Sequence, residues 1–517
     1  MSQIILSTLN ARYIHASLGL RCILANLGEL QSVTTLKEFI IDTRPIDIVE
    51  QLLASQPKII GLGVYIWNIE QSTQVVALLK QVAPDVFVVI GGPEVSYEQP
   101  SQAIFQLADY AVSGAGEKCF SDLCQGLLND ERPTGKIIPG NNGNLAELAF
   151  PYSLYNDEDI AHRIIYVEAS RGCPFKCEFC LSALDKTAKP FDMDLFLKEM
   201  ALLYQRGTRH FKFIDRTFNL KINHSIRIMK FFRIECSEAF LHFELIPDHL
   251  PDALKTEIAL FGEGRLQFEI GIQSFNPNVQ ALISRKQDND KSANNIFWLR
   301  NHSQAHLHTD LIIGLPGEDI ESIATGFNKL ASLNPHEIQV GILKRLKGTP
   351  IIRHTDNFKL RFNPYPPYNI LSTDRIDFPS MQRLNRFARY WDMIANSGRF
   401  PNTLPLLLAE TPFERFLKFS DWLYTSTHQT HKISLSRLFD LLYKGLKEAL
   451  ELTQMQIEHV LLEDFTLAGI KGHPKFLPSN INVGQNNAGV KNAGVKKSTQ
   501  QQQRTTQRQT RHRSEEG

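Results

Sequence analysis

Short apolar runs alternate with segments of helical periodicity in the first part of this chain, and this alternation restricts the folds open to it. The β-like runs lie at residues 3–6, 59–65, 86–90 and 110–113, and helical periodicity covers residues 15–30 and 69–82. Strands and helices that alternate in this way form right-handed βαβ units, in which helices cover both faces of a parallel sheet. Residues 1–140 are therefore predicted to form a doubly wound, Rossmann-like α/β domain.

A second series of strands and helices follows an irregular stretch. Residues 141–160 lack either periodicity, so we expect a linker there. Candidate strands then lie at residues 164–169, 210–214, 242–245, 266–272, 308–313 and 337–342. This repeated alternation predicts a partial TIM-type (β/α) barrel over residues 161–355, with its site on the loops that follow the strands.

Farther along the chain the pattern becomes helical. Apolar residues recur at helical spacing at Met381, Leu384, Phe387, Trp391 and Ile394. A mainly helical C-terminal domain is therefore predicted for residues 356–478. The last segment, residues 479–517, contains no aromatic residue, repeats Asn-Ala-Gly-Val-Lys and is rich in glutamine and basic residues. Such a composition cannot build a core, so this segment is expected to be a disordered basic tail.

The composition excludes several classes of protein. Hydrophobic residues make up 43% and charged residues 21% of the chain, which excludes a collagenous, coiled-coil or wholly disordered protein. The 56 Lys and Arg residues balance the 55 Asp and Glu residues, so only the basic tail supports nucleic acid as a partner. The sequence has neither a long apolar run nor a basic, signal-like start. We therefore expect a cytoplasmic protein without a membrane partner.

Three of the seven cysteines lie within eight residues, in Cys173-Pro-Phe-Lys-Cys177-Glu-Phe-Cys180, shortly after the first expected barrel strand. Three thiolates at this spacing can bind three irons of a cubane iron–sulfur cluster and leave the fourth iron open for chemistry. Zinc or an electron-transfer cluster would need a fourth protein ligand, and the nearest downstream candidate, His210, is distant in the sequence. The other four cysteines are scattered singly and are expected to be buried apolar residues.

This cysteine spacing, with the aromatic Phe179 before its last cysteine, resembles the motif of the radical S-adenosylmethionine (SAM) superfamily. The resemblance implies that Cys173, Cys177 and Cys180 bind a [4Fe-4S] cluster whose open iron chelates the amino and carboxylate groups of SAM. It further implies reductive cleavage of SAM to methionine and a 5′-deoxyadenosyl radical. The electron would come from a flavodoxin- or ferredoxin-type donor.

Later segments resemble the SAM-binding strand ends of the same superfamily, in the same order. The residues that this resemblance implies at the SAM site are Phe179, Asp215, Glu269, Gln273, Arg285 and Ile312. Glu269 and Gln273 also share one face of an apolar strand, where polar side chains need partners. Two simpler interpretations stay open, with Asp215 as a loop or helix-capping acid and Arg285 as part of an exposed basic turn.

The N-terminal domain resembles the cobalamin-binding domain that precedes the barrel in one branch of radical SAM enzymes. The implied cobalamin-binding residues are Tyr65, Gly91, Gly92, Gly114 and Glu117. At the pair Gly91 and Gly92, a β-carbon is expected to occupy the volume of the ligand. The Asp-x-His-x-x-Gly signature that supplies a histidine to cobalt is missing, and His15 stands near its place with the wrong spacing. We expect either cobalamin without a protein lower ligand or a domain that has lost the cofactor.

Together these features predict a cobalamin-type radical SAM enzyme that modifies an unknown substrate, with methylation as one outcome. Three alternatives stay open: a hydrogen-abstracting radical SAM enzyme with a vestigial cobalamin domain, an RNA-modifying enzyme, and a non-enzymatic iron–sulfur redox or sensor protein. The helical C-terminal region is similar to an uncharacterised domain attached to such proteins. That similarity adds no chemistry.

Overall fold

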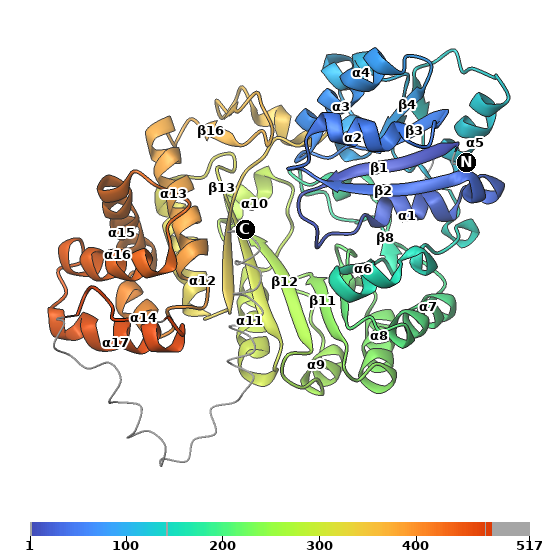
Figure 1. The fold of residues 1–517 in the computed structure, drawn as a ribbon. Coiled ribbons are helices and arrows are strands. Elements are labelled where there is room, and N and C mark those ends of the chain that lie inside the picture. Colours follow the sequence, from blue (N-terminus) through green and yellow to red (C-terminus); the bar gives the residue numbers. More distant parts are fainter. Residues whose placement is uncertain (1–2, 141–142, 471, 478–517) are drawn as a thin grey trace.

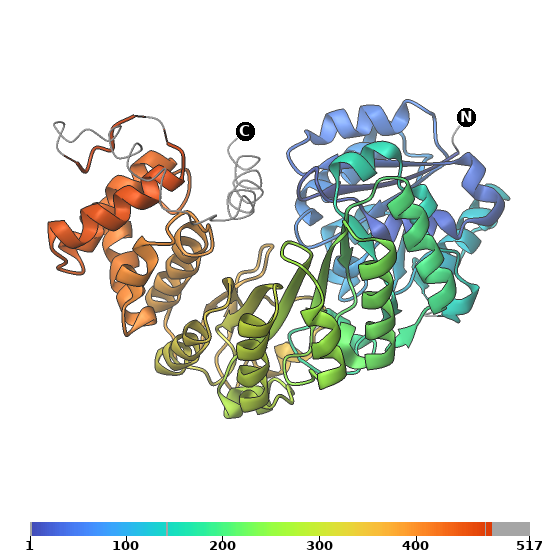
Figure 2. The same ribbon diagram turned by 90° about the horizontal axis from the view of Figure 1, so that it is seen from below.

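The computed structural model of this chain describes residues 3–140, 143–470 and 472–477 (Figure 1). It contains two six-stranded sheets, each with all its strands parallel. The N-terminal sheet and the C-terminal helices lie at opposite ends of the central sheet in both views (Figures 1 and 2). The predicted fold class is confirmed. The tail expected to be disordered, residues 479–517, lies outside the described residues.

The N-terminal sheet has the strand order β2-β1-β3-β4-β5-β6. Its strands are β1 (Ile4–Asn10), β2 (Thr34–Ile40), β3 (Ile59–Gly63), β4 (Phe87–Gly91), β5 (Tyr110–Ser113) and β6 (Ile137–Pro139). Its helices are α1 (Leu18–Ala25), α2 (Pro45–Leu53), α3 (Ile69–Val82), α4 (Ala103–Leu107) and α5 (Glu117–Leu128). Two separate apolar cores show that α2, α3 and α4 cover one face of the sheet and that α1 and α5 cover the other. This is the doubly wound arrangement.

The central sheet has the sequential order β14-β13-β12-β11-β10-β7, which describes an open barrel. Its strands are β7 (Ile165–Val167), β10 (His210–Phe213), β11 (Phe240–Leu245), β12 (Leu266–Gln273), β13 (His306–Ile313) and β14 (Glu337–Ile342). The helices between them are α7 (Met193–Gln205), α8 (Ile222–Glu235), α9 (Asp252–Ala259), α10 (Pro277–Leu282), α11 (Asn289–His302) and α12 (Ile320–Ser332). All six strands predicted from the sequence are present.

The stretch expected to be a linker contains a short helix, α6 (Asp157–His162), which the sequence analysis missed. Asn156 and Asp159 form a reciprocal capping box at its start. Asp159 is also buried in an ion network with Arg21 of α1, at 2.7 Å, and with Arg163, at 3.5 Å. Glu38 of β2 completes the network at 2.8 Å from Arg21 and 3.1 Å from Arg163. Two guanidinium groups and two carboxylates thus join the N-terminal sheet to the segment that leads into the barrel.

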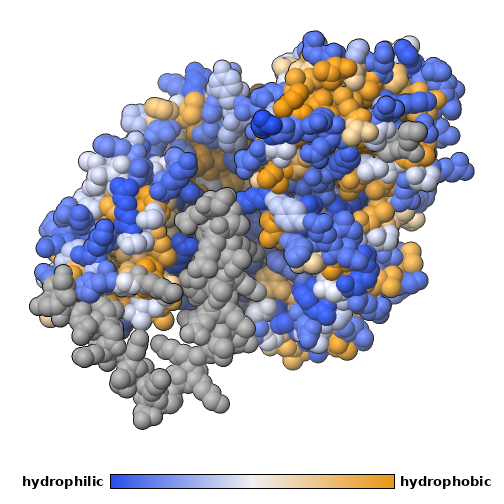
Figure 3. All heavy atoms as spheres, viewed as in Figure 1, coloured by the Kyte–Doolittle hydropathy of each residue, from blue (hydrophilic) through white to orange (hydrophobic). Residues whose placement is uncertain are grey.

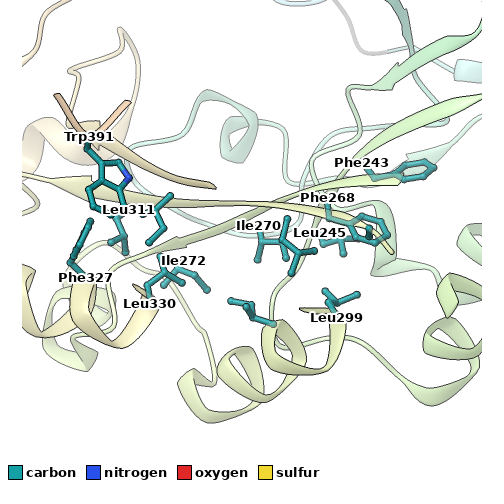
Figure 4. Packing of buried hydrophobic residues seen from close by; sticks show 14 of the residues in the cluster. Phe243, Leu245, Phe268, Ile270, Ile272, Leu299, Leu311, Phe327, Leu330 and Trp391 are labelled. Atoms are coloured by element: carbon teal, nitrogen blue, oxygen red, sulfur yellow. The ribbon is translucent and has the colours of Figure 1, made fainter. Parts of the chain in front are cut away.

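The C-terminal helices share one apolar core with the barrel. They are α13 (Phe378–Ile394), α14 (Thr403–Leu408), α15 (Pro412–Thr427), α16 (Leu435–Glu448) and α17 (Gln454–Leu467). At the junction, Phe327 of α12 packs edge-on against Trp391 of α13, with ring centroids 4.7 Å apart. Figure 4 shows these two rings beside Leu311 of β13. Phe387 contacts Phe327, Phe413 and Phe416 in the same cluster.

No helix in the described part of the chain is long and apolar enough to cross a membrane. The face seen in Figure 3 is largely hydrophilic, with apolar side chains gathered over the N-terminal domain.

We expect Phe387→Ala to lower the free energy of unfolding by about 3–5 kcal/mol, because it leaves a cavity where the barrel and the C-terminal helices meet. Denaturant unfolding followed by tryptophan fluorescence would measure the change. Phe297→Ala is the matched control, since Phe297 is 57% exposed, and it should change the stability little. Equal effects of the two substitutions would contradict a shared core at this junction.

Candidate functional site

The three clustered cysteines lie on the loop that follows β7, at the carboxyl edge of the central sheet. A small antiparallel pair, β8 (Ser170–Arg171) and β9 (Lys189–Pro190), closes the base of this loop. Gly172 has a φ of +91°, and a β-carbon there would collide with the backbone of Thr187, so only glycine fits. The Cys173 N–H donates to the carbonyl of Asp185 at 3.0 Å, and the Cys180 N–H donates to the carbonyl of Cys177 at 3.1 Å. The backbone therefore fixes the loop at both ends.

Cys173 and Cys177 are buried and Cys180 is partly exposed. Burial raises the pKa of the Cys173 and Cys177 thiols, so a cation is needed to hold both as thiolates at neutral pH. No group of three or more His, Cys, Asp or Glu side chains in the described ranges is arranged around a single metal position. A cubane cluster does not require one, because each thiolate binds a different iron atom.

Arg285 brings the cysteine loop and the end of β12 together. Its guanidinium lies 3.6 Å from Sγ of Cys177 and also donates to the carbonyl oxygen of Gly271. Gln273 ends β12 with a φ of +69°, beyond an irregularity in the pairing with β13. The side-chain oxygen of Gln273 is buried and accepts no hydrogen bond from the described residues. An unpaired buried amide oxygen at this place suits a ligand that carries N–H or O–H donors.

Asp215, which follows β10, has another task in the structure. Its carboxylate accepts hydrogen bonds from the Ala169 N–H at 2.9 Å and from the Ser170 hydroxyl at 2.6 Å. Burial raises its pKa to about 7, against these hydrogen bonds. Both carboxylate oxygens of Asp215 thus stabilise the position of the residues at the start of the cysteine loop. These contacts are typical of a loop acid, and contact of Asp215 with SAM stays a prediction.

Glu269 points from β12 into a set of charged side chains. It accepts a hydrogen bond from Nε2 of His242 at 3.0 Å and lies 3.6 Å from Nζ of Lys212. Burial would raise the pKa of Glu269, but His242 and Lys212 outweigh it and lower this pKa to about 2. The structure therefore provides partners for Glu269 within the chain.

The other two residues expected at the SAM site lie on the same edge of the barrel. Phe179 and Ile312 are both partly buried and pack against the barrel core. Ile312, near the end of β13, pairs in register with Gly341 of β14. Their contact with SAM stays a prediction.

The sequence analysis missed a charged belt on the concave face of the barrel. His308 of β13 lies 3.1 Å from Asp310 and 3.2 Å from Glu337 of β14. Burial would lower the pKa of His308, but its hydrogen bonds to these two carboxylates raise it to about 10. Arg216 pairs with Glu244 of β11 at 2.6 Å on the same side. The alternation of polar residues along the strands at 242–245 and 306–310 was the signal that could have revealed this belt.

In the N-terminal domain, the structure changes the interpretation of Gly92. This residue has a φ of +109°, and a β-carbon there would lie 2.5 Å from the carbonyl oxygen of Val64. The chain itself therefore requires glycine at Gly92. The expectation that cobalamin is what excludes a β-carbon at Gly92 was therefore wrong as an argument for a cobalamin site, because the backbone of Val64 already excludes it. At Gly91 a β-carbon would meet only Val112 at 3.7 Å, an ordinary contact.

The remaining residues of the expected cobalamin site follow neighbouring strands. Tyr65 stacks on Trp67 beyond β3, with ring centroids 4.5 Å apart, and Trp67 is 44% exposed. Gly114, beyond β5, has a φ of +90°. Glu117 begins α5 and accepts a hydrogen bond from Arg171 of the cysteine loop at 2.7 Å. Tyr65 and Trp67 thus offer an aromatic surface at the carboxyl edge of the sheet, whereas Glu117 serves the contact between domains.

His15 also lies at the contact between the two domains. It forms a parallel bridge with Ile164, and its Nδ1 lies 2.7 Å from the hydroxyl of Tyr166. The loop after β1 thereby extends the edge of the barrel sheet beside β7. That His15 is not a cobalt ligand stays a prediction.

Family models match three consecutive parts of the chain. A B12 binding domain matches residues 5–124, the radical SAM superfamily matches residues 167–328, and a protein family of unknown function, DUF4080, matches residues 356–515. The match to the B12 binding domain includes the aromatic pair Tyr65 and Trp67. The match to the radical SAM superfamily includes the cysteine loop.

Individual relatives agree with these matches. The cobalamin-dependent radical SAM methyltransferase TokK from Streptomyces tokunonensis is 25% identical over 333 residues, which cover 56% of this chain and 47% of TokK. The chain thus spans about half the length of this curated relative.

Two solved structures share the fold. One is the cobalamin-dependent SAM radical enzyme OxsB with aqua-cobalamin bound. The match has a TM-score of 0.58 and 13% sequence identity, and it covers 90% of this chain and 84% of the OxsB chain. The other is the radical SAM methyltransferase TsrM from Kitasatospora setae with cobalamin and a [4Fe-4S] cluster bound. This match has a TM-score of 0.55 and 14% sequence identity, and it covers 71% of this chain and 82% of the TsrM chain. Residues 167–328 therefore form a radical SAM domain, and residues 5–124 form a B12 binding domain in front of it.

Proposed function

We propose that this protein is a cobalamin-dependent radical SAM enzyme and that methylation is its reaction. The observation that carries the proposal is that Arg285 contacts both Cys177 and Gly271, close in sequence to the unpaired oxygen of Gln273, at the carboxyl edge of an open parallel barrel that follows a B12 binding domain. The name of TokK and the description of TsrM support methyl transfer. The substrate itself stays unassigned.

The residues fit the groups that such an enzyme holds. Cys173, Cys177 and Cys180 provide three thiolates and leave one iron of a [4Fe-4S] cluster to SAM. The unpaired oxygen of Gln273 would accept a hydrogen bond from SAM, and Arg285, 3.6 Å from Sγ of Cys177, would place a positive charge beside the cluster. Tyr65 and Trp67 offer an apolar surface to cobalamin. When bound, the cluster supplies the electron that cleaves SAM, and cobalamin supplies a carrier for a methyl group.

An external electron donor of the flavodoxin or ferredoxin type belongs to the same proposal. The seven cysteines are all free thiols in the structure, which supports a reducing, cytoplasmic setting. Hydrogen abstraction without cobalamin remains the alternative, and cobalamin binding distinguishes it from the proposal.

Each of Cys173→Ala, Cys177→Ala and Cys180→Ala should abolish formation of 5′-deoxyadenosine under dithionite, because each removes a thiolate ligand from the cluster. Iron analysis, the optical spectrum and chromatography of the product on anaerobically reconstituted protein measure this. Cys236→Ala is the matched control, since Cys236 is buried in the barrel away from the loop, and it should retain cluster and product. Wild-type product formation in any loop variant would contradict the assignment.

Gln273→Ala should weaken SAM binding by about 1–3 kcal/mol, because a buried polar partner of SAM is lost. Equilibrium binding of SAM to the reconstituted protein measures the change, with iron content as a check. Glu257→Gln is the control, since Glu257 is a buried carboxylate that pairs with Arg233 at 2.7 Å away from the cysteine loop, and it should leave SAM affinity near the wild-type value. Wild-type SAM affinity in Gln273→Ala, or an equal loss of affinity in the two variants, would contradict a role for Gln273 at the SAM site.

The wild-type protein should bind hydroxocobalamin, and Gly91→Ala should weaken that binding without unfolding the domain. Space exists beside Gly91 for a β-carbon within the fold, so a loss of affinity reports on the ligand. Absorbance titration measures binding, and His15→Ala should bind nearly as well as the wild type. Absence of binding by the wild type would reduce the N-terminal domain to a scaffold and favour the hydrogen-abstraction alternative.

A further inference from the structure

Glu178 is a buried carboxylate inside the cysteine loop, between Cys177 and Phe179. Its side chain is 4% exposed. A buried carboxylate is costly unless charged or hydrogen-bonding partners surround it. The partners of Glu178 therefore indicate what this residue does.

All the side-chain partners of Glu178 come from two segments outside its own loop. Oε1 accepts from the Ser284 hydroxyl at 2.5 Å and from the guanidinium of Arg353, and Oε2 lies 3.0 Å from Nε2 of His354. The backbone of Glu178 contacts the same two segments. Its N–H donates to the carbonyl of Ile283 at 3.1 Å, and its carbonyl accepts from the Ile351 N–H at 3.0 Å. One residue thus links the loop after β7, the end of α10 and the 3₁₀ helix at Pro350–His354.

These contacts cross the open side of the barrel. The strands β7 and β14 form the two edges of the central sheet and do not pair with each other. The cysteine loop follows β7, and the 3₁₀ helix at Pro350–His354 follows β14. The side chain of Glu178 therefore joins the two edges where the backbone ladder does not.

The same contacts determine the position of Arg285. Ser284 has a φ of +54°, which is a strained conformation for a residue other than glycine. Its hydroxyl is held by Glu178, and the next residue, Arg285, places its guanidinium against Cys177 and Gly271. A shift of Glu178 would therefore move Arg285 relative to the cysteine loop.

We propose that Glu178 is a positioning residue that closes the open side of the barrel and fixes the cysteine loop relative to Arg285 and Gln273. This inference rests on the proposed function only in naming SAM and the cluster as the ligands that the positioned residues would serve. The carboxylate acts through its contacts to Ser284, Arg353 and His354.

The test compares Glu178→Gln with Glu257→Gln in full-length, anaerobically reconstituted protein. Glu257 is a suitable control because it is also buried in the barrel and paired with an arginine, Arg233, at 2.7 Å, away from the cysteine loop. Glu178→Gln should retain iron but raise the KM for SAM about tenfold or more with a smaller change in kcat, because Arg285 and Gln273 are misplaced. The electron paramagnetic resonance spectrum of its reduced cluster should lose the change that SAM causes in the wild type. Glu257→Gln should show neither effect.

A double variant separates positioning from general destabilisation. Arg353 is 60% exposed in its side chain, so Arg353→Gln should fold. If Glu178 acts through Arg353, the double variant should have a KM within about twofold of the worse single variant, since effects in one network are not additive. Fully additive effects, or a wild-type KM and spectrum in Glu178→Gln, would overturn the proposal.

Hydrogen exchange of the cluster-free protein tests the inference without the proposed function. In Glu178→Gln, the amides of residues 172–184 should exchange about tenfold faster than in the wild type and in Glu257→Gln, because the loop loses its anchor. Equal exchange in the three proteins would overturn the positioning role. If the wild-type protein bound no cluster after anaerobic reconstitution, the proposed function would be contradicted instead.

Discussion

The parallel direction of the strands is the constraint on which the rest of this structure depends. In each sheet all carboxyl ends lie at one edge, so the loops that follow the strands meet there. In the central sheet this brings the cysteine loop, Gln273 and Ile312 to one side, although they are far apart in the sequence. The sequential strand order also leaves β7 and β14 unpaired with each other. Side chains must then supply the contacts that a closed barrel would obtain from its backbone.

Glu178 supplies such contacts through Arg353 and His354, and other charged contacts join the B12 binding domain to the barrel. Arg171, two residues before Cys173, forms a bidentate pair with Glu168 and reaches Glu117 of α5 at 2.7 Å. On the other side of the interface, Glu94 accepts from the Tyr368 hydroxyl at 2.7 Å, and Glu98 pairs with Arg345 at 2.8 Å. Removing one partner of a buried pair costs about 3–5 kcal/mol. The cysteine loop is therefore attached directly to the B12 binding domain.

The sequence predicted the elements whose apolar pattern is strong and missed those set by tertiary contacts. The six barrel strands were found because each carries a buried apolar face. The edge strand β2 was missed because it is half exposed along most of its length, and α6 was missed because its stability comes from caps and the buried Asp159. The three cysteines could be found from spacing alone. Glu178 could not, because its partners lie 106 and 175–176 residues away.

The distribution of hydrogen-bond partners separates residues that the fold explains from residues that need a ligand. Asp215, Glu269 and Glu117 are polar and buried enough to suggest a binding site, yet each has partners within the chain. Gly92 is likewise explained by the backbone of Val64. Gln273 differs, because its side-chain oxygen is buried at the strand end without a partner among the described residues. Leaving such an atom unpaired costs about 1–3 kcal/mol. Under the proposed function, this unpaired oxygen at the end of β12, two residues beyond the Gly271 carbonyl that Arg285 contacts, is the acceptor to which SAM would donate.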